Sequence, residues 1–423
     1  MKVQVLGVKF LRYLEKYTKT DMVYLAKGGF WLSVGQGMAM ISSFALSVLL
    51  ARALPQETFG TYKFILSITS IISGLSLSGL GTALLQSVAR GKDGTLFLAI
   101  RTQLIWTSVL GVTFLLAAGY YGLNGNYTIA TSLLIAGATT PFVNCFGMYG
   151  SFLNGKKDFK RSTLYWIISH IVNVSVIALI AITTQSVVYL VSGYFISQLI
   201  MTIVFYRRTI SIYSPDKNNN DPEMITYGSH LSAINIFGTI ANQLDKILVF
   251  HFVGAAPLAA YSFAFAIPEQ IKASLKNLVT VGVPKLAELG EDHLRKSIID
   301  KILRLTVVCS AIVVLYWIAA PYIFATLFPA YMNAVFYSQL YMIGLIFFPG
   351  ISLFALYFQL MQQTAVQYKL SIIGNVVTIV LGVVLIARYG TLGAVLENTL
   401  SWGVILFVNL IFFIQRGYKT KKI

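Results

Sequence analysis

Charged side chains occur within stretches of this sequence that are otherwise strongly apolar. In one stretch Asp245 precedes Lys246, and in the next Glu269 is followed three residues later by Lys272 and seven residues later by Lys276. A lysine ammonium pairs with a phosphate group as a compact point charge. We therefore expect Lys246, Lys272 and Lys276 to bind an anionic group such as a phosphate in a central cavity.

The carboxylates of these stretches allow two interpretations. Asp245, Glu269 and, in a later apolar stretch, Glu397 could each carry a coupling ion, either a proton or sodium. Alternatively, Glu269 pairs with Lys272 or Lys276, Asp245 pairs with a neighbour, and Glu397 is a hydrogen-bonded structural acid. Both interpretations require that every charge has a partner or water, because an isolated buried charge is very unfavourable.

Three of the apolar stretches have a polar face at helical spacing. Residues three or four positions apart lie on the same side of a helix. Such series occur in the stretches around residues 62–85, 228–253 and 256–280. They predict three helices around a shared aqueous cleft, whose uncharged lining comprises Ser67, Ser70, Asn235, Thr239 and Asn242.

The composition indicates what kind of chain these helices belong to. Of the 423 residues, 57% are apolar and 11% are charged. An ordinary soluble domain has about 25% charged residues, so the composition excludes a water-soluble enzyme. It also excludes a disordered chain, which would have far less apolar surface. The sequence is that of a polytopic membrane protein.

Twelve stretches are long enough to cross a bilayer as helices, which takes about 20 mostly apolar residues. A polar segment separates them into two sets of six. The predicted fold is therefore all-α, with twelve transmembrane helices in two six-helix lobes. The stretches are 29–51, 62–85, 98–121, 128–151, 162–184 and 186–206, then 228–253, 256–280, 302–327, 334–361, 369–388 and 391–415.

The distribution of cations orients these helices. Of the 32 Lys and Arg residues, 26 fall on the side of the N-terminal segment, three lie within spans, and only Arg52, Lys63 and Arg388 fall on the opposite side. Because Lys and Arg concentrate on the cytoplasmic side of membrane proteins, both termini are predicted to be cytoplasmic. The net charge of +17 then reflects topology, and nucleic-acid binding is not needed to explain it.

The same pattern divides the chain into five parts. They are a basic, amphipathic cytoplasmic segment suited to the membrane surface (1–28), an N-lobe (29–206), a flexible cytoplasmic linker (207–227), a C-lobe (228–415) and a basic cytoplasmic tail (416–423).

The two lobes also resemble each other at an offset of 199 residues. This offset aligns Tyr62 with Tyr261 and Phe64 with Phe263, where the first and second spans of each lobe meet. Parallel repeats of this kind are typical of transporters that bind their substrate between the lobes.

Four segments carry a resemblance to a known family. They are AKGGFWLSVGQG (26–37), LLARALPQETFGTYKFILSI (49–68), GLSLSGLGTALLQSVAR (74–90) and QLDKILVFHFVGAAPLAAYSFAFAIPEQI (243–271). With them the chain resembles, over essentially its whole length, the Wzx-type polysaccharide-biosynthesis flippases of the multidrug/oligosaccharidyl-lipid/polysaccharide exporter (MOP) superfamily. The resemblance implies a fold like that of MATE transporters and lipid II flippases. It also implies that undecaprenyl-diphosphate-linked oligosaccharide repeat units move from the cytoplasmic to the outer leaflet by alternating access.

The resemblance implies a setting as well. The glycan would be of O-antigen, capsule or exopolysaccharide type, and the location would be the bacterial inner (cytoplasmic) membrane. Partners would be the lipid-linked oligosaccharide, membrane lipids, and the polysaccharide polymerase and chain-length machinery. A diphosphate carries about two negative charges and so suits the lysine patch, while hydroxyls and amides suit the sugars.

The main alternative is an ion-coupled antiporter of drugs or organic cations from the same superfamily. Attracting a cation calls for buried acids, and all five acids before residue 200 lie in tails or loops, which weighs against this alternative. An enzyme is disfavoured because the chain has no metal-ligand spacing, phosphate-cradling glycine loop or intramembrane histidine paired for catalysis. We therefore expect no catalytic residue, no metal and no cofactor.

Overall fold

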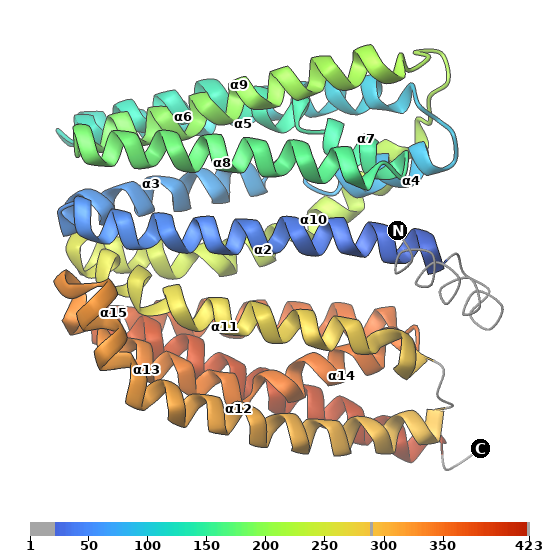
Figure 1. Ribbon diagram of the computed structural model, residues 1–423, viewed down its shortest axis with the longest axis vertical. Coiled ribbons are helices and arrows are strands. Elements are labelled where there is room, and N and C mark those ends of the chain that lie inside the picture. Colours follow the sequence, from blue (N-terminus) through green and yellow to red (C-terminus); the bar gives the residue numbers. More distant parts are fainter. Residues whose placement is uncertain (1–21, 288–290, 421–423) are drawn as a thin grey trace, which may run out of the picture.

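The computed structural model describes residues 22–287 and 291–420, and all regular elements in these ranges are helices (Figure 1). Most of the predicted segment 1–28, and the last three residues of the predicted tail 416–423, lie outside the described residues. The first half of the chain forms α2 (Met22–Ala53), α3 (Gln56–Gly74), α4 (Leu80–Ala89), α5 (Thr95–Leu123), α6 (Tyr127–Phe146), α7 (Tyr149–Gly155), α8 (Phe159–Thr183) and α9 (Val187–Tyr213).

The second half is also helical. Its elements are α10 (Glu223–Phe252), α11 (Ala255–Ala287), α12 (Glu291–Leu327), η1 (Pro329–Ala334), α13 (Val335–Ile343), η2 (Gly344–Ile346), α14 (Phe348–Leu360) and α15 (Thr364–Thr420). The predicted span 334–361 is thus α13 and α14 joined by a short 3₁₀ turn, and the predicted span 62–85 is α3 and α4 separated by a break.

The long element α15 is two antiparallel helices. The chain reverses at Gly390, whose φ of 56° lies in the left-handed region that a side chain disfavours. Beyond the turn the two arms pack so closely that a Cβ atom on Gly393 would lie 2.0 Å from the carbonyl oxygen of Leu385. The two arms correspond to the predicted spans 369–388 and 391–415.

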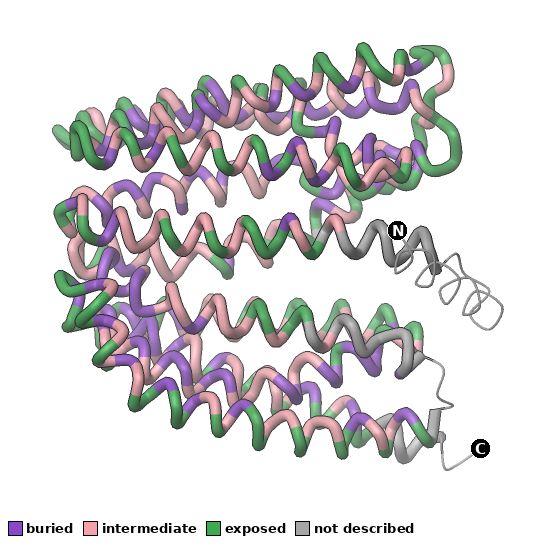
Figure 2. The backbone as a smooth tube through the Cα atoms, viewed as in Figure 1, coloured by how far each residue is buried: buried purple, intermediate pink, exposed green. Residues whose placement is uncertain are grey.

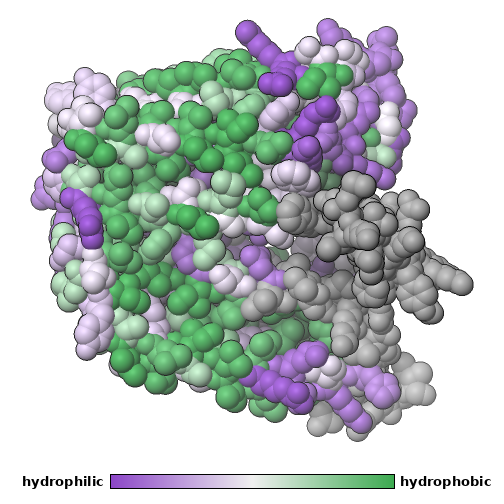
Figure 3. Space-filling model, in the orientation of Figure 1, coloured by the Kyte–Doolittle hydropathy of each residue, from purple (hydrophilic) through white to green (hydrophobic). Residues whose placement is uncertain are grey.

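Eight elements of the described chain are long and apolar enough to cross a membrane, and one of them contains both arms of α15. The remaining long elements, α3 with α4, α10 and α11, are not among these eight. They are the helices predicted to carry polar faces. The twelve predicted spans are thus consistent with the described chain. The three most polar ones are not among the eight apolar elements because their polar faces lower their mean hydropathy. Figure 3 shows the apolar surface as a broad band between two hydrophilic ends.

The helices form two lobes that meet at one end of the molecule (Figure 1). At that end Phe59 stacks on Phe263 with 4.4 Å between ring centroids, and Phe64 stacks on Phe250 at 3.7 Å. Gly60 permits this approach, because a Cβ atom there would lie 1.8 Å from the carbonyl oxygen of Ala255. The largest buried core cluster is built around these contacts, and buried residues gather at the same end in Figure 2.

The internal repeat is visible in the helix boundaries. Helix α2 ends at Ala53 and α3 begins at Gln56, whereas α10 ends at Phe252 and α11 begins at Ala255. Both boundaries are separated by the predicted offset of 199 residues. The aligned residues Tyr62 and Tyr261 are both buried.

The connection between the lobes runs from Ser214 to Pro222, between α9 and α10, and lies within the predicted linker 207–227. Asp221 accepts hydrogen bonds from Arg90 at 2.7 Å and from Ser87 at 2.8 Å, and the backbone N–H of Gly94 donates to the carbonyl of Asn219 at 2.8 Å. The prediction of a flexible linker did not anticipate these contacts with the N-lobe.

Candidate functional site

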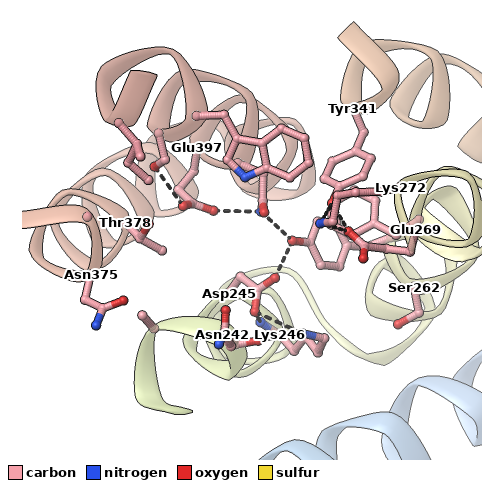
Figure 4. Close-up of a pocket in the computed structure, with 18 of the residues that line it drawn as sticks. Asn242, Asp245, Lys246, Ser262, Glu269, Lys272, Tyr341, Asn375, Thr378 and Glu397 are labelled. Atoms are coloured by element: carbon pink, nitrogen blue, oxygen red, sulfur yellow. Dashed lines mark hydrogen bonds and ion pairs between the residues drawn. The ribbon is translucent and has the colours of Figure 1, made fainter. Parts of the chain in front are cut away.

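A cavity of about 590 Å³ lies within the C-lobe where it faces the N-lobe, and we call it the C-lobe cavity (Figure 4). Its walls come from α10, α11, α13 and both arms of α15, and Lys63 of α3 closes it from the N-lobe side. Six predicted site residues line it: Asn242, Asp245, Lys246, Glu269, Lys272 and Glu397.

One ion-pair cluster lies on the α11 side of the C-lobe cavity. Glu269 and Lys272 are three residues apart on α11, so they project from one face and form an ion pair at 2.5 Å. The hydroxyl of Tyr341 on α13 donates to the same carboxylate oxygen of Glu269. The Lys272 ammonium also lies 4.4 Å from the ring centre of Trp402, within the range of a cation–π interaction.

A second cluster lies on α10 and is paired in the same way. The ammonium of Lys246 lies 3.3 Å from Asp245 and donates to the carbonyl of Asn242 at 2.9 Å. The other carboxylate oxygen of Asp245 accepts a hydrogen bond of 2.5 Å from Tyr261 of α11. Glu269 is thus paired with Lys272, one of its two expected partners, and Asp245, expected to pair with a neighbour, is paired with Lys246.

Glu397 belongs to a hydrogen-bond chain that leads back to Asp245. Asn398 donates to Tyr261 at 3.1 Å and to Glu397 at 2.8 Å, and Ser401 donates to the other carboxylate oxygen of Glu397 at 3.1 Å. Glu397 is only 1% exposed. Its hydrogen-bond donors are neutral, and within the part of the chain that the structure describes it forms no ion pair, unlike Asp245 and Glu269.

Lys63 is a cavity residue that sequence reasoning did not select as a site residue. It was expected at the outer end of the span 62–85, on the polar face with Ser67, whereas α3 begins at Gln56, so Lys63 lies two turns inside that helix. It lines the C-lobe cavity and two further cavities in the N-lobe. Within the described residues its ammonium forms no ion pair or hydrogen bond and is placed 5.4 Å from the Phe59 ring. Its position at the head of the polar face that continues through Ser67 was the available signal.

Three cavities of about 410, 310 and 610 Å³ lie mainly among N-lobe helices, and we call them the N-lobe cavities. The predicted lining residues Ser67 and Ser70 line the first of them, together with Lys63 and Lys246. Most other polar residues of these cavities are hydroxyls and amides. The N-lobe and C-lobe cavities adjoin at the two lysines.

The remaining predicted site residues lie elsewhere. Thr239 packs against Gly74 of α3, and its hydroxyl donates to the carbonyl of Asn235 at 3.1 Å. Asn235 lies 3.5 Å from Ser78. Neither lines the cavities described above, so both join α10 to the α3–α4 region. Lys276 lines a separate, more apolar cavity of about 750 Å³, which Lys272 also borders.

Sequence reasoning did not select the partners of the predicted charges. Tyr261 was used only to align the two lobes and Tyr341 was not considered, although each donates to a carboxylate. The polar residues of α15 stand in long apolar runs. Their signal is helical spacing alone, seen in Ser371, Asn375 and Thr378 of the C-lobe cavity.

The comparison with protein families agrees with this architecture. The family model described as polysaccharide biosynthesis protein matches residues 25–290, which is more than half of the chain. The chain belongs to this family. This match, together with the solved structures below, confirms the recognition from sequence.

Relatives of known sequence or structure cover nearly the whole chain. An uncharacterized membrane protein of Methanocaldococcus jannaschii is 21% identical over 94% of this chain and 97% of its own length. An inward-facing multidrug-resistance MATE family transporter of the MOP superfamily has a TM-score of 0.70 and 15% identity, covering 93% of this chain and 99% of its own. The lipid II flippase MurJ in an inward closed conformation has a TM-score of 0.67 and 14% identity, covering 90% and 86%.

These matches show the fold of the chain. It is the all-helical MATE and lipid II flippase fold that was predicted, and the two solved structures named above are a transporter and a flippase. The expectation that the chain is not an enzyme agrees with this family and these relatives.

Proposed function

We propose that this chain is a flippase for undecaprenyl-diphosphate-linked oligosaccharide repeat units of O-antigen, capsule or exopolysaccharide type. It would carry them from the cytoplasmic to the outer leaflet of a bacterial inner membrane, with both termini in the cytoplasm, and deliver them to the polysaccharide polymerase and chain-length machinery. The observation that carries the proposal is the convergence of Lys63, Lys246 and Lys272, from three helices of two lobes, on one cavity.

The pairing of these lysines suggests how an anion would bind. Lys246 and Lys272 each hold a carboxylate of their own helix, Asp245 and Glu269. A diphosphate carries about two negative charges and can take the place of both carboxylates, because a lysine ammonium pairs with a phosphate as well as with a carboxylate. Binding would then exchange one ion pair for another at each lysine. The displaced carboxylates would keep their hydrogen bonds from Tyr261 and Tyr341 or take up a proton, because an unpaired charge is costly in a membrane. Lys63, which lies over the Phe59 ring and forms no ion pair among the described residues, would add a third cation.

The closed end of the molecule gives the direction of access. The lobes meet through Phe59 and Phe263, and Arg52 donates to the carbonyl of Thr326 across the same interface. If the termini are cytoplasmic, the closed end faces outward and a headgroup would enter from the cytoplasm. Outward release would require these contacts to separate while the lobes close at the other end.

The driving force follows from the charge of the substrate and from the cavity acids. An inside-negative potential favours outward movement of an anion by about 2.3 kcal/mol per charge per 100 mV. Proton or sodium coupling would use Asp245, Glu269 or Glu397, which the substrate disturbs directly or through Tyr261 and Asn398. Transport into vesicles should then respond to an ion gradient at fixed voltage. A response to voltage alone would contradict the coupling.

Lipid analysis of a deletion strain of the native host tests the proposed substrate. Mass spectrometry should show accumulation of a polyprenyl-diphosphate oligosaccharide together with loss of the surface glycan, and expression of the wild-type chain should reverse both. The mass also identifies the carrier lipid and the repeat unit. Normal glycan without lipid accumulation, in a strain with no second flippase, would contradict the proposal.

The same strain tests the alternative of an organic-cation antiporter. The observation that favours it is the presence of three carboxylates, Asp245, Glu269 and Glu397, in the C-lobe cavity. An antiporter would leave lipid and glycan unchanged on deletion and would make the strain sensitive to cationic drugs.

A further inference from the structure

The N-lobe cavities contain buried hydroxyls that have no partner. Thr69, Thr140 and Thr163 are each more than nine-tenths buried, yet their hydroxyl groups form no hydrogen bond among the described residues. Thr69 and Thr140 line the 410 Å³ cavity, and Thr163 lines the 610 Å³ cavity. Unpaired buried polar groups are unfavourable. Others lie elsewhere in the described chain, but these three gather around adjoining cavities, where a ligand can supply the missing partner.

Amide groups of the same cavities are unpaired as well. The amide nitrogen of Asn144 and the amide oxygen of Asn154 are buried without a partner. Gln198 lines all three N-lobe cavities, and its side chain makes no hydrogen bond within the described chain. The unpaired set therefore contains a donor, an acceptor and hydroxyls that are both. A phosphate only accepts and an ammonium only donates, so neither satisfies the set, whereas a ligand with several hydroxyls does.

The rest of the lining fits an uncharged ligand with an apolar face. Trp166 is 46% exposed and lines the 310 and 610 Å³ cavities, where its ring offers a rigid, flat surface. No carboxylate lines any of the three cavities within the described chain. Their lysines, Lys63 and Lys246, lie where they adjoin the C-lobe cavity. A sugar ring combines hydroxyls at its edge with apolar C–H faces, which matches this lining.

We propose that the N-lobe cavities are the subsite for uncharged sugar rings of the lipid-linked glycan. The inference rests on the proposed flippase function, because the lysines shared with the C-lobe cavity would hold the diphosphate and so direct the attached sugars into the N-lobe. Thr140, Thr163, Asn144 and Gln198 hydrogen-bond the sugar hydroxyls, and Trp166 packs against a ring face.

The test compares two probes on the purified full-length protein in detergent. One is the polyprenyl-diphosphate glycan that accumulates in the deletion strain, and the other is the same lipid after its sugars are removed beyond the diphosphate. Thr140→Val and Thr163→Val remove a hydroxyl at nearly constant size. Each should weaken binding of the glycan lipid about threefold to tenfold, the value of one hydrogen bond, and leave binding of the stripped lipid unchanged.

Thr209→Val is the matched control. Thr209 is a fully buried N-lobe threonine that lines none of these cavities, and its hydroxyl donates to the carbonyl of Phe205 at 2.7 Å. Its removal should lower the melting temperature without changing affinity for either probe. The cavity variants should instead keep or raise the melting temperature of the unliganded protein, because they remove an unpaired polar group.

The outcomes separate the two proposals. Loss of affinity for the glycan lipid alone supports the sugar subsite. Equal affinity of Thr140→Val, Thr163→Val and wild type for the glycan lipid overturns it and assigns the cavities to water, with the flippase proposal intact. An equal loss for both probes also overturns it. If wild-type protein binds neither probe, both proposals fail together.

Discussion

The C-lobe cavity and the N-lobe cavities differ in how their polar groups are satisfied. In the C-lobe, Lys246, Lys272, Asp245 and Glu269 are paired before any ligand arrives. Around the N-lobe cavities, several hydroxyls and amides lie buried without a partner among the described residues. A ligand must therefore compete with existing ion pairs in the C-lobe cavity, whereas in the N-lobe cavities it only displaces water.

This difference suggests a division of tasks between the lobes. Charged groups act over distance and tolerate variation in shape, so the C-lobe cavity suits the diphosphate that every repeat-unit lipid shares. Hydrogen bonds are directional, so the N-lobe cavities suit the sugars that distinguish one glycan from another. The comparison predicts that C-lobe changes alter binding of all substrates, whereas N-lobe changes alter the choice among them.

Loss of Lys63 should have the largest effect, because this residue borders both kinds of cavity. Lys63→Ala removes a cation that has no competing carboxylate, and charge-assisted hydrogen bonds contribute about 1.5–3 kcal/mol. We expect affinity for both the stripped lipid and the glycan lipid to fall about 10- to 100-fold, measured by titration of the purified protein. Lys63→Arg should retain most of the affinity. A loss confined to the glycan lipid would place Lys63 in the sugar subsite and contradict the comparison.

The two partners on α11 should respond in opposite directions. Lys272→Ala removes a cation and should weaken binding of the stripped lipid about tenfold, with export impaired at normal membrane levels of the protein. Glu269→Gln removes the carboxylate that competes for Lys272 and should strengthen binding of the stripped lipid. Titration of each variant with the stripped lipid shows whether the two affinities change in opposite directions. Weaker binding in both would mean that the pair holds α11 to α13 through Tyr341 and does not exchange with an anion.

Gln198 provides a smaller test from the N-lobe side. Gln198→Leu keeps the approximate size of the side chain and removes its amide, so affinity for the glycan lipid should fall about threefold to tenfold. Affinity for the stripped lipid should not change. Competition between repeat units of different sugar composition shows whether selectivity changes as well, and unchanged selectivity would weaken the division of tasks.

Replacement of Asp158 should have the smallest effect on binding, because this residue lies outside the C-lobe cavity and the N-lobe cavities. It caps the first turn of α8, where the backbone N–H of Arg161 donates to it at 3.1 Å, and it also binds Tyr213 and the Arg161 guanidinium. Burial raises the pKa of Asp158, but the hydrogen bonds from Tyr213 and Arg161 and the positive charge of Arg161 outweigh it, so the pKa lies below its ordinary value.

A lowered carboxyl pKa stabilises the fold at pH values above the ordinary value of about 4, and this stabilisation is lost as the pH falls through the folded-state pKa. Asp158→Ala should lower the free energy of unfolding by about 1 kcal/mol at neutral pH, the usual value of an N-cap. Thermal unfolding at pH 7 and pH 3 checks this, since the difference from wild type should shrink at pH 3. Binding of both probes should be unchanged, and a change would show that the loops affect the cavities.

Hydropathy predicted most of the fold because membrane-spanning helices must be long and apolar. The twelve stretches and the offset of 199 residues agree with the described helices. Two interruptions of the helices were not predicted from the sequence. The interruption between α3 and α4, and the 3₁₀ turn before α14, lie inside apolar runs that average hydropathy treats as continuous.

Helical periodicity predicted the charged residues of the site and missed the tyrosines that pair with them. It selected Asp245, Lys246, Glu269 and Lys272, because these residues lie on polar faces of α10 and α11. It could not show that Tyr261 and Tyr341 satisfy the carboxylates, since that depends on how helices distant in sequence pack together. It also placed Asn235 and Thr239 in the cleft, because spacing shows which residues share a face and not where along its length that face meets a neighbour.

The most direct test of the central claim is a transport measurement in proteoliposomes. Glycan lipid is placed in both leaflets, and a glycosidase added outside digests the sugars that it can reach. In vesicles with wild-type protein, digestion should proceed past the outer-leaflet fraction toward completion. In vesicles with the Lys63→Ala variant, digestion should stop near the fraction reached in protein-free vesicles. Digestion by wild-type vesicles that stops at that same level, with protein shown to be folded and inserted, would contradict the account.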